Sequence, residues 1–193
     1  AELERRAVEA VDHPWFGEGK PPVILAVGRL TPAKDYPTLL RAFSKVRSKH
    51  DCRLIILGEG ELRPMLEALV KDLDIDDSVQ MPGFVDNPFS WMRQAKLFVL
   101  SSAWEGLPNV LIQAMACGTP VVSTDCHSGP REILEGGKWG TLVSVGDCVA
   151  LADAIGAALD FPSHCNVRER ASYFNTENAI NGYIKTIYQN ILK

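Results

Sequence analysis

The sequence of 193 residues lacks the features that mark several classes of protein. No apolar run comes near the roughly 18 residues that a membrane-spanning helix needs. No block of lysine and arginine occurs, and the net charge of −4 at pH 7 gives the chain no general attraction for nucleic acid. What is present is an ordinary globular composition, 46% hydrophobic and 23% charged, which is enough for one domain with a sizeable core.

The cysteines indicate neither a CxxC motif nor a metal site. There are five, they form no CxxC pair, and none stands at metal-ligand spacing from a histidine. An odd number of scattered cysteines is typical of reduced thiols in a cytoplasmic protein. No cluster of aspartates and histidines occurs either, so we expect neither a metal ion nor another cofactor. The cysteines are Cys52, Cys117, Cys126, Cys148 and Cys165.

The start of the chain suggests how it is organised. It reads AELERRAVEAVDHPWF, without a methionine or a signal-peptide pattern, so we expect a piece of a longer protein. Within this piece we expect residues 1–20 to be a peripheral segment and residues 21–193 to form one domain. We expect the protein to lie in the cytoplasm, either free or at the inner face of the membrane.

Short apolar segments alternate with amphipathic segments along the chain. The apolar segments are rich in β-branched residues and predict strands over residues 23–28, 53–58, 79–83, 97–102, 120–124 and 140–145. The amphipathic segments predict helices over residues 37–49, 61–73, 87–95, 108–117, 147–160 and 176–192. This alternation predicts an α/β fold, a doubly wound parallel sheet of about six strands with right-handed crossovers.

Several helix ends carry signals of their own. Asn87 followed by Pro88 is typical of an N-cap with proline in the first turn. Pro108 is expected to begin its helix in the same way, and Gly118 is typical of a helix C-terminus. Thr176 is the expected N-cap of the last helix.

Polar side chains follow the predicted strands at the edge where open parallel sheets bind ligands, outside the carboxyl ends of the strands. After the first strand, Gly28 allows close backbone approach, and Arg29 and Lys34 place two cations in one short loop. These cations either clamp a phosphate, arginine through forked hydrogen bonds and lysine as a point charge, or are solvated surface residues. His127, after the fifth strand, is either an acid–base group or, as we favour, a solvated loop residue.

The next two loops give weaker signals. Gly58 opens the segment GEGELR, in which Arg63 stands where a dinucleotide-binding fingerprint has its third glycine. A tight turn into the following helix therefore explains Gly58 better than a ligand does. Phe84 and Val85 lie at a loop tip and either cover a flat ring such as a nucleobase or, slightly favoured, pack on the neighbouring helix.

The loop after the fourth strand combines three features. Glu105 follows the strand, Gly106 removes a side chain, and Pro108 begins a helix whose N-terminal N–H groups attract phosphate. Alternatively, Glu105 serves only as a charge at the helix N-terminus. Gln113 lies eight residues beyond Glu105, which at the helical rise corresponds to about 12 Å. Polar groups at both ends of this span suit a ligand of two rings joined by a diphosphate, although backbone groups alone also satisfy a helical glutamine.

Four segments carry a resemblance to a known family, in that family's order and spacing: VGRLTPAKDYPTLLRAF, LIILGEGELRPMLEAL, MPGFVDNP and LSSAWEGLPNVLIQAMACGTPVVSTDCHSGPREIL. From about Val23 to Leu134 the chain resembles the C-terminal half of GT-B glycosyltransferases of family 4, also called glycosyl transferases group 1. The resemblance implies a Rossmann-like domain that binds a UDP-, GDP- or ADP-sugar. It also implies hexosyl or N-acetylhexosaminyl transfer, with retention, to a glycan or lipid-linked acceptor held by a separate N-terminal domain. Without that domain we expect the chain to be inactive.

The resemblance assigns roles residue by residue. Arg29 and Lys34 would hold the diphosphate, and Glu105, as the first acid of the E-x7-E motif, would contact the sugar and be the catalytic residue. The loop at Phe84 and Val85 would meet the base, and backbone amides of residues 107–110 would meet phosphate. The full set of expected donor-binding residues is Gly28, Arg29, Lys34, Gly58, Phe84, Val85, Gly106, Leu107, Pro108, Asn109, Val110 and Gln113.

One position departs from the family pattern. Gln113 stands where the second acid of the motif would bind the ribose diol. A carboxylate accepts charge-assisted bonds from two hydroxyls, whereas an amide has a single acceptor, so we expect a weaker ribose contact. Two alternatives therefore stay open: a non-catalytic nucleotide-sugar-binding or partner-docking module, and a nucleotide-sugar epimerase on the same architecture.

Overall fold

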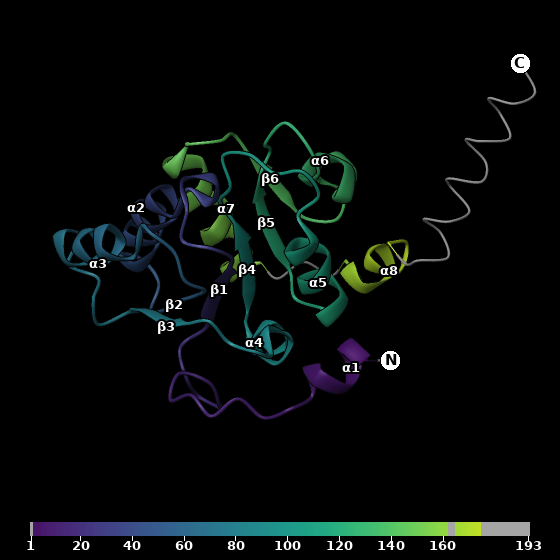
Figure 1. Ribbon diagram of the computed structural model, residues 1–193, viewed down its shortest axis with the longest axis horizontal. Helices are drawn as coiled ribbons and strands as arrows, with labels where there is room; N and C mark the ends of the chain where they lie inside the picture. Colours follow the sequence, from purple (N-terminus) through teal and green to yellow (C-terminus); the bar gives the residue numbers. More distant parts are fainter. Residues whose placement is uncertain (1, 162–164, 175–193) are drawn as a thin grey trace, which may run out of the picture.

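A parallel sheet of six strands forms the centre of the computed structural model, which describes residues 2–161 and 165–174 (Figure 1). The strand order is β3-β2-β1-β4-β5-β6, and every neighbouring pair runs parallel. The chain winds outward from β1 in one direction and from β4 in the other, which confirms the predicted doubly wound sheet. The strands are β1 (Val23–Val27), β2 (Arg53–Leu57), β3 (Val79–Gly83), β4 (Leu97–Leu100), β5 (Val121–Thr124) and β6 (Thr141–Val143).

The helices predicted between residues 37 and 160 are confirmed to within a few residues. The helix predicted over residues 176–192, with its N-cap Thr176, lies outside the described residues. The sequence did not predict α1, α6 and α8, because helices of six, four and six residues are too short to show a helical period. The helices are α1 (Glu2–Ala7), α2 (Tyr36–Arg47), α3 (Arg63–Asp72), α4 (Pro88–Gln94), α5 (Asn109–Cys117), α6 (Pro130–Ile133), α7 (Cys148–Asp160) and α8 (Val167–Ser172), with 3-10 turns η1 (Pro32–Lys34) and η2 (Glu135–Gly137).

Helices cover both faces of the sheet, so successive strand residues enter two separate cores. In β1, Ile24 and Ala26 pack in the core that α2, α3 and α7 complete. Val23 and Leu25 pack in the other core, with α1, α4, α5, α6 and α8. Because neither face of the central strands meets water, β1 and β4 are apolar throughout, as the sequence pattern predicted, whereas the edge strands β3 and β6 are partly exposed.

The N-terminal segment packs against α4, although the sequence suggested that residues 1–20 are peripheral. Ala7 is only 4% exposed and belongs to the second core. Arg6 forms an ion pair with Asp86 at 2.8 Å, and the Asn87 side chain donates to the Arg6 carbonyl oxygen at 2.8 Å. Asn87 occupies the predicted N-cap position of α4, but its side chain makes this contact with α1 instead of capping the helix.

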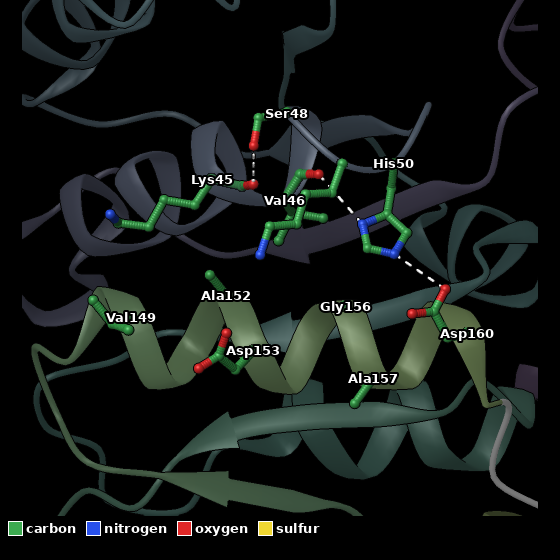
Figure 2. Close-up of a pocket in the computed structure, with 11 residues that line it drawn as sticks. Lys45, Val46, Ser48, His50, Val149, Ala152, Asp153, Gly156, Ala157 and Asp160 are labelled. Atoms are coloured by element: carbon green, nitrogen blue, oxygen red, sulfur yellow. Dashed lines mark hydrogen bonds and ion pairs between the residues drawn. The ribbon is translucent and has the colours of Figure 1, made fainter.

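A groove of about 520 Å³ lies between the carboxyl-terminal end of α2 and α7, which lines it from Val149 to Asp160 (Figure 2). His50 Nε2 lies 3.1 Å from Asp160 Oδ1 and so joins the two helix ends. Gly156 lies beneath the ring, and a Cβ there would lie 3.4 Å from His50 Cε1, at van der Waals contact. Both helices run away from the carboxyl edge of the sheet, so this contact fixes α7 on α2 at the edge opposite the predicted site.

All five cysteines are free thiols. Cys52 and Cys117 are buried, and burial raises the pKa of each thiol to about 11. Both therefore stay protonated and unreactive near neutral pH.

The loops after β1 and β2 touch backbone to backbone. A Cβ at Gly58 would lie 2.0 Å from the carbonyl oxygen of Gly28, and a Cβ at Gly60 would lie 2.4 Å from that of Leu30. Gly58 also has a φ of +140°, which side chains rarely adopt. Both glycines of the GEGEL segment are thus required by packing alone.

Gly58→Ala is expected to lower the free energy of unfolding by about 2–4 kcal/mol, because positive φ and a backbone clash add together. Urea denaturation measures the change. Gly146→Ala is the matched control, since Gly146 also has positive φ (+75°) but has no atom within 4 Å of a Cβ. An equal loss in the two variants would show that the contact between the loops contributes nothing.

Candidate functional site

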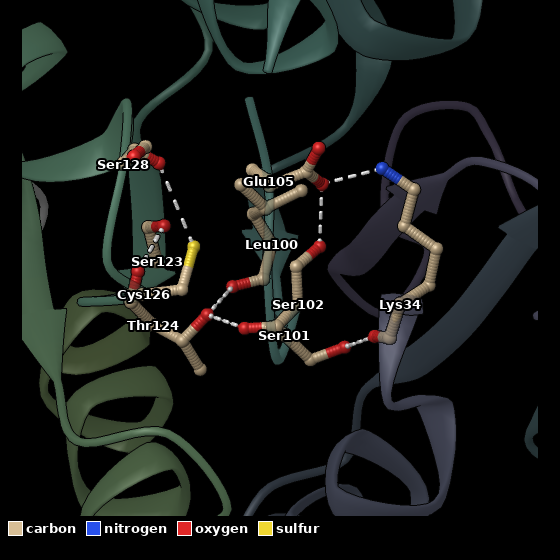
Figure 3. Close-up of polar contacts among 9 residues, drawn as sticks. All are labelled: Lys34, Leu100, Ser101, Ser102, Glu105, Ser123, Thr124, Cys126 and Ser128. Atoms are coloured by element: carbon tan, nitrogen blue, oxygen red, sulfur yellow. Dashed lines mark hydrogen bonds and ion pairs between the residues drawn. The ribbon is translucent and has the colours of Figure 1, made fainter. Parts of the chain in front are cut away.

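The predicted polar residues meet where the winding of the sheet reverses, at the carboxyl ends of β1 and β4. Lys34 lies in η1, just after β1, and its ammonium forms an ion pair with the carboxylate of Glu105, which follows β4 (Figure 3). The two side chains are 19% and 11% exposed, so the pair is largely removed from water. Loops diverge from neighbouring strands at such a reversal and leave a crevice in which ligands of open α/β sheets bind.

Hydroxyl groups hold the two loops together. Ser102 Oγ donates to Glu105 Oε1 at 2.7 Å, and Ser101 Oγ donates to the Lys34 carbonyl oxygen at 2.7 Å. From β5, Thr124 Oγ1 donates to the Ser102 carbonyl oxygen at 2.6 Å (Figure 3). The sequence analysis missed these three hydroxyls. The signal was available, because both apolar strands end on hydroxyl side chains in LFVLSS and PVVST.

Gly28 provides the close approach that the sequence predicted, but the partners are side chains of this chain. A Cβ at Gly28 would lie 3.0 Å from Lys34 Cε and 3.0 Å from the hydroxyl oxygen of Tyr36. Tyr36 is 3% exposed. Burial, and to a lesser extent the charge on Glu105, raises the pKa of Tyr36 well above its usual range, so its hydroxyl stays protonated.

A cavity of about 380 Å³ gathers the predicted residues of the first three loops. Its wall is largely apolar on the side of β3, where Phe84 is 79% exposed. Arg29 is exposed at the rim of this cavity, whereas Lys34 forms its ion pair with Glu105. The lining residues are Val27, Gly28, Arg29, Leu57, Gly58, Glu59, Phe84, Val85 and Pro88.

Glu59 is a lining residue that the sequence analysis did not select. Arg63 donates to both of its carboxylate oxygens, at 2.8 and 2.7 Å, and these hydrogen bonds hold the pKa of Glu59 below its usual value. An ionised carboxylate beside apolar side chains disfavours a phosphate there. The cavity therefore suits a neutral ring better than an anion.

Gln113 lines a second hollow, of about 570 Å³, which shares no lining residue with the cavity at Phe84. Among the described residues the Gln113 side chain has no hydrogen-bond partner. The lining residues are Leu3, Leu107, Asn109, Ile112, Gln113, Ala116, Glu132, Ala171, Tyr173 and Phe174. The structure thus divides the predicted residues between two hollows, with Lys34 beside the first and Glu105 in the loop that leads to the second.

The start of α5 leaves backbone donors free. The helix begins at Asn109, one residue later than predicted, with Pro108 as its N-cap, and ends at Gly118 in the left-handed conformation as expected. The Asn109 N–H donates to the Leu107 carbonyl oxygen at 2.8 Å. Within the part of the chain that the structure describes, the N–H groups of Leu107 and Val110 donate to no protein atom, and they are available to an anion.

Two glycines determine how closely other groups can approach the start of α5. Gly106 is exposed and has no atom within 4 Å of a Cβ, so the backbone there is open to a ligand. Gly129, after β5, packs so closely that a Cβ would lie 2.4 Å from Pro108 Cδ.

His127 in the same loop is exposed, and its Nδ1 lies 3.3 Å from Ser128 Oγ.

Residues 2–161 and 165–174 contain no helix that is both long and apolar enough to cross a bilayer. In the same ranges, no three His, Cys, Asp or Glu side chains are grouped so that they would hold a metal ion.

The doubly wound sheet, with an acid and a lysine at its reversal point, defines an open α/β domain with a ligand-binding crevice, and comparison with known proteins gives its family. The family described as glycosyl transferases group 1 matches residues 21–160. The chain belongs to this family. Its structural neighbours are glycosyltransferases of the GT-B fold, which confirms the fold class and the resemblance inferred from sequence.

Relatives of known name support this assignment. The chain is 42% identical over 122 residues to N-acetylgalactosamine-N,N'-diacetylbacillosaminyl-diphospho-undecaprenol 4-alpha-N-acetylgalactosaminyltransferase of Campylobacter jejuni, covering 63% of this chain and 33% of that protein. It is 32% identical over 177 residues to N-acetyl-alpha-D-glucosaminyl L-malate synthase of Bacillus anthracis, covering 89% and 46%. The chain therefore spans less than half the length of these curated relatives.

A solved structure carries a ligand of the expected kind. Anabaena HepE in complex with UDP-glucose superposes with a TM-score of 0.71 at 26% sequence identity, covering 89% of this chain and 48% of that one. In this ligand a diphosphate joins the ribose of the nucleoside to the glucose.

The Lys34–Glu105 pair is expected to stabilise the two loops measurably. In a double-mutant cycle with Lys34→Met and Glu105→Gln, we expect a coupling free energy of about 1–3 kcal/mol from urea unfolding, because the pair is mostly buried. The control cycle uses Arg131→Met and Asp125→Asn, whose arginine is 69% exposed, and should give about 0.2–1 kcal/mol. Coupling at Lys34–Glu105 no larger than the control would contradict a shielded pair.

Proposed function

We propose that this chain is the donor-binding half of a glycosyltransferase, which binds a nucleoside-diphosphate sugar and supplies the sugar to an acceptor held by a separate N-terminal domain. The observation that carries the proposal is the juxtaposition of Lys34 and Glu105 beside the free amides at the start of α5. A cation and helix-terminal donors suit a diphosphate, and a carboxylate suits sugar hydroxyls.

Each part of the donor has a matching surface. The base enters the apolar cavity at Phe84 and Val85, where the Glu59 carboxylate accepts from a ring N–H. The diphosphate lies between Lys34 and the amides of Leu107 and Val110, and Arg29 at the cavity rim completes its neutralisation. The ribose follows the base out of the cavity, and the amide of Gln113, which lines the second hollow, is the proposed partner of its hydroxyls.

The Lys34–Glu105 ion pair supplies one cation and one carboxylate for the reaction. When the donor binds, Lys34 exchanges Glu105 for a phosphate oxygen, and Glu105 accepts hydrogen bonds from hydroxyls of the donor sugar, still supported by Ser102. As the bond from the sugar to the diphosphate breaks, negative charge grows on the leaving phosphate. Lys34, Arg29 and the amides are already oriented to stabilise it, so this arrangement needs no metal ion. We propose that the configuration of the sugar is retained.

The acceptor belongs to the remainder of the protein. One relative is named for an undecaprenol-linked substrate and another for L-malate, so the acceptor chemistry differs within the family. We propose a glycan or lipid-linked acceptor, with the protein in the cytoplasm and, for a lipid-linked acceptor, at the inner face of the membrane.

Calorimetric titration of the purified protein with UDP-, GDP- and ADP-sugars tests the proposal. One of them should bind, in EDTA as well as in magnesium, and Lys34→Ala and Arg29→Ala should each weaken binding about tenfold or more, since each removes a charged contact to phosphate. Lys20→Ala, a lysine at the opposite edge of the sheet, is the control. If neither variant changes affinity, the phosphate clamp does not exist. Donor binding by the protein together with its N-terminal domain, without any sugar transfer or free-nucleotide release, would instead favour a non-catalytic module.

Restoring an acid at position 113 tests the ribose contact separately. Gln113→Glu is expected to tighten donor binding about tenfold, because a carboxylate accepts charge-assisted bonds from both ribose hydroxyls. Gln94→Glu adds the same charge to an exposed position at the end of α4 and should change nothing. Titration with the nucleoside diphosphate measures both. Unchanged or weaker binding by Gln113→Glu would place the ribose elsewhere.

A further inference from the structure

The hydroxyl of Tyr36 is an unused polar group beside the Lys34–Glu105 pair. Tyr36 is the first residue of α2 and is 3% exposed, with its ring in the core beneath the site. Its hydroxyl oxygen reaches Gly28, where it stands 3.0 Å from the position of a Cβ, opposite Lys34 Cε at the same distance. Within residues 2–161 and 165–174, it has no hydrogen-bond partner.

The ring is buried, whereas the hydroxyl oxygen keeps some contact with solvent, so it can meet a ligand at the end of β1. The side chains of the nearby ion-pair cluster bind one another. Lys34 and Ser102 both bind Glu105, and Ser101 binds the Lys34 carbonyl oxygen. The Tyr36 hydroxyl is therefore a hydrogen-bond donor available to a ligand at the end of β1.

The surroundings of the hydroxyl select the kind of partner. The phenol stays protonated, because burial and the nearby Glu105 charge raise its pKa, so at neutral pH it is available as a donor. Its neighbour across Gly28 is the stem of a lysine, and an anion bound by that ammonium lies within reach of the hydroxyl. A donor next to a cation suits an anionic oxygen, which makes hydrogen bonds stronger than those of a neutral acceptor.

We propose that the Tyr36 hydroxyl donates a hydrogen bond to a phosphate oxygen of the bound nucleoside diphosphate, as a third side-chain contact beside Lys34 and Arg29. This inference rests on the proposed function. It adds a binding residue from the start of α2 to those of the loops after β1 and β4.

Tyr36→Phe tests the proposal, because it removes the hydroxyl and keeps the ring. Calorimetry with UDP, GDP and ADP, and with the corresponding nucleosides, identifies the nucleotide that the unaltered protein binds. For that nucleotide we expect Tyr36→Phe to raise the Kd of the diphosphate about tenfold to a hundredfold and to leave the Kd of the nucleoside unchanged. The melting temperature should change little, because the ring that fills the core is kept.

Thr119→Val is the matched control. It also removes one buried hydroxyl without changing the shape of the side chain, but at the amino end of β5, where Thr119 Oγ1 donates to the Met92 carbonyl oxygen. It should lower the melting temperature and leave both affinities unchanged.

The outcomes separate the two proposals. A diphosphate that binds the unaltered protein and Tyr36→Phe equally well overturns the role of Tyr36 and leaves the proposed function standing. Equal losses for diphosphate and nucleoside, with a lower melting temperature, also overturn it, because they indicate a structural role. If no nucleoside diphosphate binds the unaltered protein, both proposals fail.

Discussion

The ion pair between Lys34 and Glu105 is the contact on which the site depends. It joins the loop after β1 to the loop after β4, two segments that lie 71 residues apart in the chain and meet only because β1 and β4 are neighbours in the sheet. Largely shielded from water, the pair is stronger than a surface ion pair. It also holds a cation and an acid side by side at the point where the winding of the sheet reverses.

Close backbone packing gives this pair its position. Gly58 and Gly60 let the loop after β2 rest on the carbonyl groups of Gly28 and Leu30, and Gly129 lets the loop after β5 rest on Pro108. Side chains at these positions would push the loops apart. The rim of the sheet is therefore nearly rigid where the diphosphate is proposed to bind, and pre-organised groups stabilise developing charge without reorganising.

Much of the fold was predictable because its signals are local. The six strands and the helices of nine residues or more each carry their own period, and Gly118 ends α5 as its type suggests. The short helices α1 and α8 have no such signal, and their positions depend on packing against α4 and α5. Likewise Glu105 and Lys34 were selectable as residue types in loops, but Tyr36 reads from sequence as an ordinary core residue.

The sequence by itself determined the alternation of apolar and amphipathic segments, the polar residues at the strand ends and the motif that marks the family. Those features depend on residue type and spacing, which a linear chain displays in full. The tertiary structure alone decided which of these residues touch. It pairs Lys34 with Glu105, it places Gln113 in a hollow apart from the cavity at Phe84, and it brings the Tyr36 hydroxyl beside Gly28. Such contacts depend on the order and twist of the strands and on how closely loops pack, and these are properties of the whole sheet.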